Sequence, residues 1–207
     1  MKFLITTLTL AAALASAGTA LAQSAVVGQP APAFSAKDTS GKTVSLADFK
    51  GKHVVLEWVN PGCPYVRKHY DAKNMQATQQ GATAQGVVWL AVNSTAPEYG
   101  DYQPPAELAA WMKAQGAAAT ATLMDEDGKV GRAYGARTTP HMYVIDGAGK
   151  LVYAGAIDNK PTSRASDIPG ATNHVKVALA ESLAGKPVST ASTRAYGCTV
   201  KYSNAGE

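Results

Sequence analysis

Short hydrophobic runs alternate along the chain with segments whose apolar residues recur at helical spacing. Runs rich in Val, Ile, Leu or aromatic side chains and bounded by Gly, Pro or Asn are typical of strands. They predict strands at residues 34–36, 43–45, 53–59, 87–92, 120–124, 141–145 and 151–156. Apolar residues three or four positions apart, with Pro near the start or Gly after the end, predict helical segments instead. These are residues 46–49, 65–80, 104–115, 128–134 and 173–183.

The order of these elements predicts the architecture. The first two strands flank the turn 38–41 and the last two flank the turn 146–149, so each pair is predicted to form a hairpin. Between the hairpins, strands and helices alternate, which is typical of an α/β fold whose sheet is covered by helices on both faces. We therefore expect a central mixed sheet with an N-terminal hairpin and, after residue 187, an irregular tail.

Residues 1–22 have the pattern of a secretory signal peptide. Lys2 provides the positive start, residues 3–17 are apolar or small and uncharged, and residues 20–22 (Ala-Leu-Ala) have the form of a cleavage site. We expect cleavage before Gln23 and a secreted or periplasmic mature protein. An uncleaved membrane anchor is the alternative, but the segment is short and weakly apolar for that role.

Composition narrows the class of protein. The 207 residues are 46% hydrophobic and 16% charged, which is typical of one folded domain rather than a disordered chain. The net charge is only +4 without a basic block, so no nucleic-acid partner is expected. After residue 22 no apolar run approaches the roughly 20 residues of a membrane-spanning helix, so no membrane contact is expected after cleavage. The predicted domain is 23–187, and the predicted tail is 188–207.

The chain contains two cysteines, Cys63 and Cys198. This number excludes disulfide-stapled miniproteins, iron–sulfur carriers and four-thiolate zinc modules. The four histidines have no metal-ligand spacing, so neither a metal nor another cofactor is expected. In an exported protein both thiols meet oxidising conditions, in which disulfides persist.

Cys63 lies where a thiol is expected to be reactive. It follows the predicted strand 53–59 and the loop Asn60-Pro61-Gly62, and Pro64 marks the first turn of the next helix. Unpaired backbone N–H groups and the helix dipole stabilise a thiolate at such a position. The alternative is an inert buried thiol.

Several charged side chains are candidates to act on this thiol. Arg67 and Lys68 follow Cys63 within about one turn of the helix, and Arg137 is a further basic candidate from elsewhere in the chain. The alternative for the basic pair is exposed helix residues without a role, and for Lys68 the two interpretations are equally supported. Glu57, inside an apolar strand, is either a proton acceptor for the cysteine or a residue that points outward at a sheet edge, and we favour the edge position.

A second element is the sequence Thr138-Thr139-Pro140-His141 before an apolar strand. A proline is tolerated there if it occupies the first position of the strand. We expect a cis Thr139–Pro140 bond, with the Thr139 backbone exposed beside the Cys63 turn as an edge on which an extended peptide or a thiol substrate docks. An ordinary trans proline is the alternative.

Three runs of the sequence resemble a known family. They are LEWVNPGCPYV, GARTTPHMYVIDGAGKLVYAGAID and AGKPVSTASTRAYGCTVKY. They are similar to thioredoxin-like redoxins of the AhpC/TSA, peroxiredoxin-like type, in the subgroup with an HCPYV-like motif and a GCSIKW-like tail. The resemblance covers roughly residues 26–204 and implies a thioredoxin-like fold. It also implies that Cys63 is the attacking or peroxidatic cysteine, Pro140 the cis proline and Thr139 the substrate-facing residue.

The chain departs from the family pattern at two positions. Val66 stands where thioredoxins have a second cysteine, so a local dithiol is absent and copper delivery is poorly supported. Asn60 stands where peroxiredoxins have the Thr or Ser that holds the peroxide, which weakens a peroxidase assignment. Cys198 is then the one candidate to resolve an oxidised Cys63. A permanent structural disulfide between the same two residues is an equally supported alternative.

The sequence therefore predicts an exported thiol-dependent oxidoreductase. Its catalytic residues would be Cys63 and Cys198, its substrate a peroxide or a disulfide, and its partner a thiol reductant or a disulfide-bearing protein. The candidate substrate-binding or thiolate-stabilising residues are Asn60, Pro64, Arg67, Arg137, Thr139 and Pro140. The alternative is a non-catalytic thioredoxin-fold binding module, stabilised by the disulfide, whose Thr139–Pro140 edge captures a partner.

Overall fold

The structure, a computed structural model, describes residues 24–203. The predicted signal peptide, residues 1–22, lies outside the described residues. Within residues 24–203, no helix has the length and apolar character that a membrane crossing requires.

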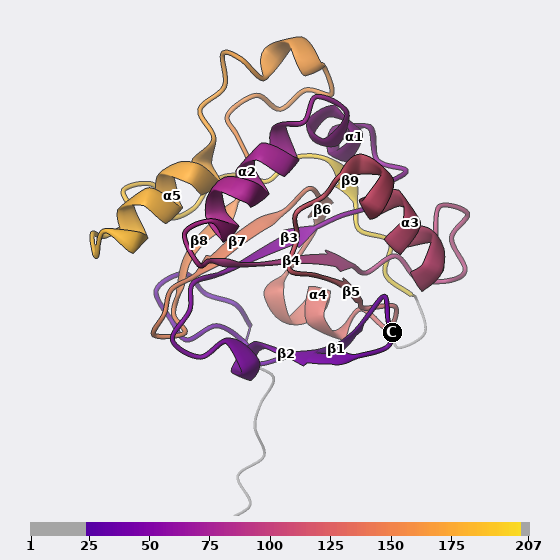
Figure 1. Cartoon of the computed structure of the whole chain (residues 1–207), viewed down its shortest axis with the longest axis horizontal. Helices are drawn as coiled ribbons and strands as arrows, with labels where there is room; N and C mark the ends of the chain where they lie inside the picture. Colours follow the sequence, from indigo (N-terminus) through magenta and orange to yellow (C-terminus); the bar gives the residue numbers. More distant parts are fainter. Residues whose placement is uncertain (1–23, 204–207) are drawn as a thin grey trace, which may run out of the picture.

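A seven-stranded mixed sheet with the strand order β2-β1-β5-β4-β3-β7-β8 forms the centre of the fold (Figure 1). Its strands are β1 (Ser35–Asp38), β2 (Thr43–Ser45), β3 (Val54–Trp58), β4 (Val88–Asn93), β5 (Ala121–Met124), β7 (Met142–Ile145) and β8 (Leu151–Gly155). β3, β4 and β5 are parallel, whereas β7 pairs antiparallel with β3 and with β8. Both predicted hairpins, β1–β2 and β7–β8, are confirmed.

Helices cover both faces of this sheet. They are η1 (Leu46–Phe49), α1 (Pro64–Asp71), α2 (Asn74–Thr83), α3 (Pro105–Gln115), α4 (Lys129–Tyr134), η2 (Ala165–Asp167) and α5 (His174–Leu183). Side chains alternate along β3, so Val55 packs in a core layer with α1, α2, α3 and α5, whereas Val54 and Leu56 pack with α4 and the N-terminal segment. The predicted α/β class is confirmed.

The helix predicted over residues 65–80 is in fact two helices. Lys73 separates α1 from α2 because its backbone takes the left-handed conformation, with φ of 60°. At the break, the Tyr70 carbonyl accepts hydrogen bonds from Lys73 N (3.0 Å) and from Gln76 Nε2 (2.9 Å). Apolar spacing continues across the break, so the periodicity alone predicted one helix.

Glu57 does not point outward at a sheet edge, which corrects the sequence interpretation. β3 is flanked by β4 and β7 and covered on both faces, and Glu57 is fully buried. Its carboxyl group accepts hydrogen bonds from Tyr70 Oη (2.9 Å), Gln79 Nε2 (3.0 Å) and Trp89 Nε1 (2.7 Å). Burial raises the pKa of Glu57 to about 7 although these three donors favour the ionised form.

The tail, predicted to be irregular, contains a short strand and runs along the domain (Figure 1). β9 (Cys198–Thr199) pairs antiparallel with β6 (Thr138–Thr139) in a separate two-stranded ribbon. Upstream of β9, Ala191 and Thr193 exchange backbone hydrogen bonds with Ala154 at the edge of β8 (3.1 and 3.2 Å). Strands of two residues have no hydrophobic period, so the sequence pattern predicted neither β6 nor β9.

Candidate active site

Cys63 is the residue that caps α1 at its N-terminus. It has an extended backbone conformation (φ −82°, ψ 121°), and Pro64 occupies the first turn, as expected. The Cys63 carbonyl accepts the amides of Val66 (3.1 Å) and Arg67 (2.9 Å) and so begins the helix. Its side chain makes no capping hydrogen bond to the helix amides, and the residue is 2% exposed. The sulfur is directed elsewhere.

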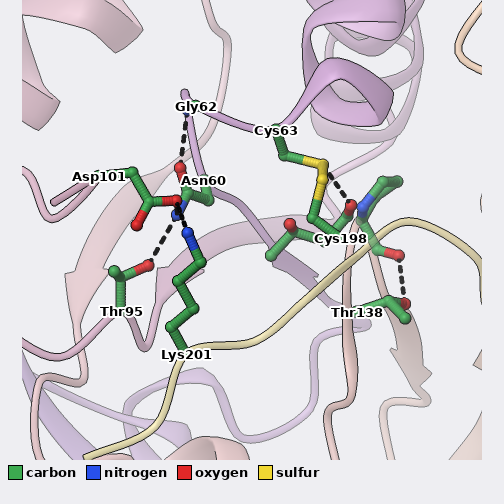
Figure 2. Close-up of a disulfide and its surroundings, with 10 residues drawn as sticks. Asn60, Gly62, Cys63, Thr95, Asp101, Thr138, Cys198 and Lys201 are labelled. Carbon is green, nitrogen blue, oxygen red and sulfur yellow. Dashed lines mark hydrogen bonds and ion pairs between the residues drawn. A yellow bond between two sulfur atoms is a disulfide. The ribbon is translucent and has the colours of Figure 1, made fainter. Parts of the chain in front are cut away.

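The sulfur of Cys63 is joined to Cys198 by a disulfide (Figure 2). The Cα atoms of the pair are 5.9 Å apart, within the usual range for disulfides, and the bond closes a sequence separation of 135 residues. Cys63 Sγ also lies 3.0 Å from the Thr139 carbonyl oxygen. Thr139 is directly opposite Cys198 in the β6–β9 ribbon. The Thr139–Pro140 bond is cis, as expected, but the predicted exposed edge is wrong, because Thr139 is 4% exposed and is paired with the tail.

Cys198 is the more accessible of the two cysteines, because it is partly exposed whereas Cys63 is buried. The close approach of the tail at this point requires the preceding residue to be glycine. A Cβ atom on Gly197 would lie 2.1 Å from the Thr139 carbonyl oxygen, and Gly197 has φ of +143°. Gly197 therefore lets the tail lie against β6 closely enough to present Cys198 to Cys63.

Asn60 shapes the loop before Cys63 (Figure 2). Its Oδ1 accepts the Gly62 amide (2.7 Å), and its Nδ2 donates to Thr95 Oγ1 (2.9 Å) and to Asp101 Oδ2 (3.0 Å). Both N–H groups and the carbonyl of the side chain are therefore engaged by the protein itself. Lys201 Nζ donates to the same Asp101 oxygen (2.6 Å), which links this loop to the tail beyond Cys198.

The basic candidates do not meet at the sulfur. Arg67 is exposed, and its Nε lies 3.8 Å from the Asp71 carboxylate. Arg137 is exposed too, and its backbone rather than its side chain supports the site, because its carbonyl accepts the Val200 amide of the tail (3.0 Å). Lys68, considered above as an exposed residue, has a fully buried side chain. The structure thus brings together Cys63, Cys198, Thr139, Pro140 and Pro64, with Asn60 beneath them.

Sequence reasoning missed a largely buried polar cluster between α1 and the tail. It consists of Lys68 and His69 on α1, Asp158 after β8, and Tyr196 in the tail. The available signals were an acid two residues after the predicted strand 151–156 and a tyrosine two residues before Cys198. Within residues 24–203, no group of three or more His, Cys, Asp or Glu side chains is arranged to hold a metal ion.

A cysteine that follows the central strand, caps the next helix and faces a cis proline defines a thioredoxin-like protein. Within that class, residues 27–154 match the family model described as the AhpC/TSA family. The match covers more than half of the chain, and the chain belongs to this family.

Similar proteins agree with this class. The thiol:disulfide interchange protein DsbE of Yersinia pestis is 30% identical over 139 residues, 66% of this chain and 67% of that protein. The thiol-disulfide oxidoreductase ResA of Bacillus subtilis is 28% identical over 132 residues, 60% of this chain and 64% of that protein. The chain thus spans just under two thirds of the length of ResA. A putative thioredoxin from Neisseria meningitidis has a TM-score of 0.53 and 25% identity over 75% of this chain and 94% of its own.

Proposed function

We propose that this protein is an exported thiol–disulfide oxidoreductase in which Cys63 and Cys198 are the redox couple. The observation that supports this most directly is the disulfide at the N-terminus of α1 beside the Thr139 carbonyl. Val66 occupies the place of a local second thiol, so Cys198 provides the partner from the tail. The names of the relatives ResA and DsbE describe the same chemistry.

The difference in exposure between the two cysteine residues suggests the order of the exchange. An incoming thiolate attacks Cys198 Sγ, the S–S bond to Cys63 breaks, and Cys63 leaves as a thiolate. A second thiol of the same substrate then attacks the mixed disulfide at its own sulfur and releases Cys198 as a thiolate. The protein gains two electrons, and the substrate dithiol becomes a disulfide. The Cys63 side chain makes no hydrogen bond to the amides of α1, so the helix dipole alone, and not the expected amide contacts, favours the leaving thiolate of Cys63.

A disulfide or dithiol substrate is favoured over a peroxide. In the peroxide reaction, the Cys63 thiolate takes one oxygen and becomes a sulfenic acid, which condenses with Cys198 and loses water. That reaction needs polar groups free to hold the peroxide. Every polar group of the Asn60 side chain is already bonded within the protein. This arrangement gives Asn60 a role in shaping the loop rather than in binding peroxide.

The alternative of a non-catalytic binding module is less favoured. That reading needs the Thr139–Pro140 edge to be free for an extended partner. The edge is paired with the chain's own Cys198–Thr199 strand. A partner strand cannot form the same backbone hydrogen bonds while β9 is in place.

Turnover of the two cysteine variants tests the proposal. The wild-type protein, with the disulfide, is expected to oxidise dithiothreitol and to be regenerated by glutathione disulfide. Cys63→Ser and Cys198→Ser both lack the disulfide and are expected to lose this turnover. With glutathione disulfide alone, Cys63→Ser holds glutathione on the more accessible Cys198, which mass spectrometry detects. Retained turnover in Cys63→Ser refutes the couple. So does a wild-type reduction potential below about −300 mV, because a structural disulfide sits in that range.

Two further measurements complete the test: the rate of oxidation by hydrogen peroxide and the N-terminus of the exported protein. If peroxide converts the reduced protein to the disulfide faster than glutathione disulfide does, the substrate assignment is wrong although the couple stands. Export predicts that protein recovered from outside the cytoplasm begins at Gln23, which N-terminal sequencing determines.

A further inference from the structure

The cluster of the buried Lys68, His69 and Asp158 with the half-buried Tyr196, called here the tail latch, connects the tail to α1. Tyr196 Oη donates a hydrogen bond to Asp158 Oδ1. Asp158 Oδ2 lies 3.7 Å from Lys68 Nζ and 3.9 Å from His69 Nε2. The Lys68 and His69 side chains are 0% exposed and that of Asp158 is 2% exposed. Lys68 Nζ also donates to the Lys160 carbonyl (3.0 Å).

The protonation states of the latch follow from its hydrogen bonds and its burial. His69 Nδ1 accepts from Asn74 Nδ2 (2.8 Å), so the ring proton is on Nε2, which faces Tyr196 Oη at 3.4 Å. Burial lowers the pKa of His69 to about 4, so the ring is neutral near pH 7. Burial and the hydrogen bond to Asp158 raise the pKa of Tyr196, so its hydroxyl keeps the proton that it donates. Burial lowers the pKa of Lys68, whose Nζ lies opposite the Asp158 side chain.

The tail latch shares its elements with the two sulfurs. α1 carries Lys68 and His69, and Cys63 caps the same helix. On the tail, Gly197 alone separates Tyr196 from Cys198. The Tyr196 ring also packs edge to face on Tyr65 of α1, with 5.9 Å between the ring centres. None of these contacts includes a sulfur atom, so reduction of the disulfide removes none of them.

We propose that the tail latch holds Cys198 opposite Cys63 in the reduced protein, which makes Tyr196 a positioning residue for the redox couple. The proposal rests on the proposed function, because it concerns the same two thiols. A tether that restricts the tail raises the effective concentration of one thiol at the other and so favours the disulfide. By linkage, the disulfide and the latch stabilise each other by the same free energy.

Tail docking without a disulfide is tested first in Cys63→Ser. Hydrogen exchange with mass spectrometry is measured over residues 197–202 at pH 7, with and without Tyr196→Phe. We expect the segment to be protected in Cys63→Ser and to exchange at least about tenfold faster once Tyr196→Phe removes the hydroxyl bond. Tyr134→Phe is the matched control, because its buried hydroxyl donates to Pro32 O (2.8 Å) and its ring packs in the core layer on the opposite face of the sheet from Cys63.

The second measurement keeps both cysteines and determines the equilibrium between the protein and a glutathione redox buffer. Tyr196→Phe is expected to make the disulfide about tenfold easier to reduce, which is about 30 mV for a two-electron couple, whereas Tyr134→Phe leaves it unchanged. Free exchange of residues 197–202 in Cys63→Ser alone overturns the proposal, as does a Tyr196→Phe equilibrium within twofold of the control. The thiol–disulfide equilibrium with glutathione is measured without any turnover assay. If the wild type has no oxidoreductase activity but Tyr196→Phe still shifts this equilibrium, the proposed function is refuted and the role of the tail latch is not.

Discussion

Replacing Glu57 by Gln tests whether a buried carboxyl group makes the stability of this protein depend on pH. Glu57 lies in the central strand, where Tyr70, Gln79 and Trp89 all donate to it. Gln has nearly the same shape but is neutral at every pH. Its N–H₂ group takes the place of Oε1 and donates to the Tyr70 hydroxyl oxygen, while its carbonyl oxygen still accepts from Gln79 and Trp89.

The expected magnitude follows from the raised pKa. A carboxyl group whose pKa rises from 4.5 to about 7 on folding binds its proton more tightly in the folded protein by roughly 3 kcal/mol. Between pH 4.5 and 7 the unfolded chain releases this proton while the folded protein retains it. The free energy of unfolding therefore falls as the pH rises through this window, and the contribution is complete below pH 4.5 and lost above pH 7.

Urea unfolding of the oxidised protein at pH values from 4 to 8, followed by circular dichroism, measures the effect. Other titrating groups contribute equally to both proteins, so the difference between the wild type and Glu57→Gln isolates this carboxyl group. We expect the difference to change by roughly 3 kcal/mol in favour of the variant between pH 4 and 8. Glu107→Gln, the same change at an exposed position of α3, should parallel the wild type. Parallel profiles for Glu57→Gln as well refute the reasoning.

Three further substitutions probe the site. Cys198→Ser removes a cross-link across 135 residues and should lower the free energy of unfolding by about 5 kcal/mol in the chain-entropy model, so a loss below about 1 kcal/mol in urea contradicts that account. Gly197→Ala places a methyl group against the Thr139 carbonyl and should lift β9, which a higher free-thiol count after purification reports and an unchanged count contradicts. Asn60→Ala removes three hydrogen bonds and should cost about 1–3 kcal/mol while slowing the reduction of the disulfide, whereas an unchanged reduction rate speaks against its role in shaping the loop.

The parts of the fold that were predictable from the sequence are those with a strong local pattern. The apolar run of β3 predicts a buried central strand, and Pro105 and Gly116 delimit α3. The break at Lys73 was not predictable, because it depends on the hydrogen bonds that the Tyr70 carbonyl accepts from Lys73 and Gln76 in the folded chain. Glu57 was misplaced for a related reason, since its partners come from three separate elements.

The candidate site also has parts that were predictable from the sequence and parts that were not. The positions of Cys63 and Pro140 follow from the residues immediately around them, and both are confirmed in the structure. The pairing of β9 with β6 depends on the Gly197 contact, which no periodicity encodes. The tail latch joins Lys68 to Asp158 and Tyr196 across long sequence separations, so only the folded chain brings these groups together.

The long span of the Cys63–Cys198 bond has a topological consequence. The polypeptide between these residues is a covalent ring that contains β4, β5, β7 and β8, whereas β1, β2 and β3 lie on the arm before it. A protease that nicks a surface segment inside the ring, such as the one between β8 and α5, therefore cannot release a fragment. The two pieces stay joined until a thiol opens the ring.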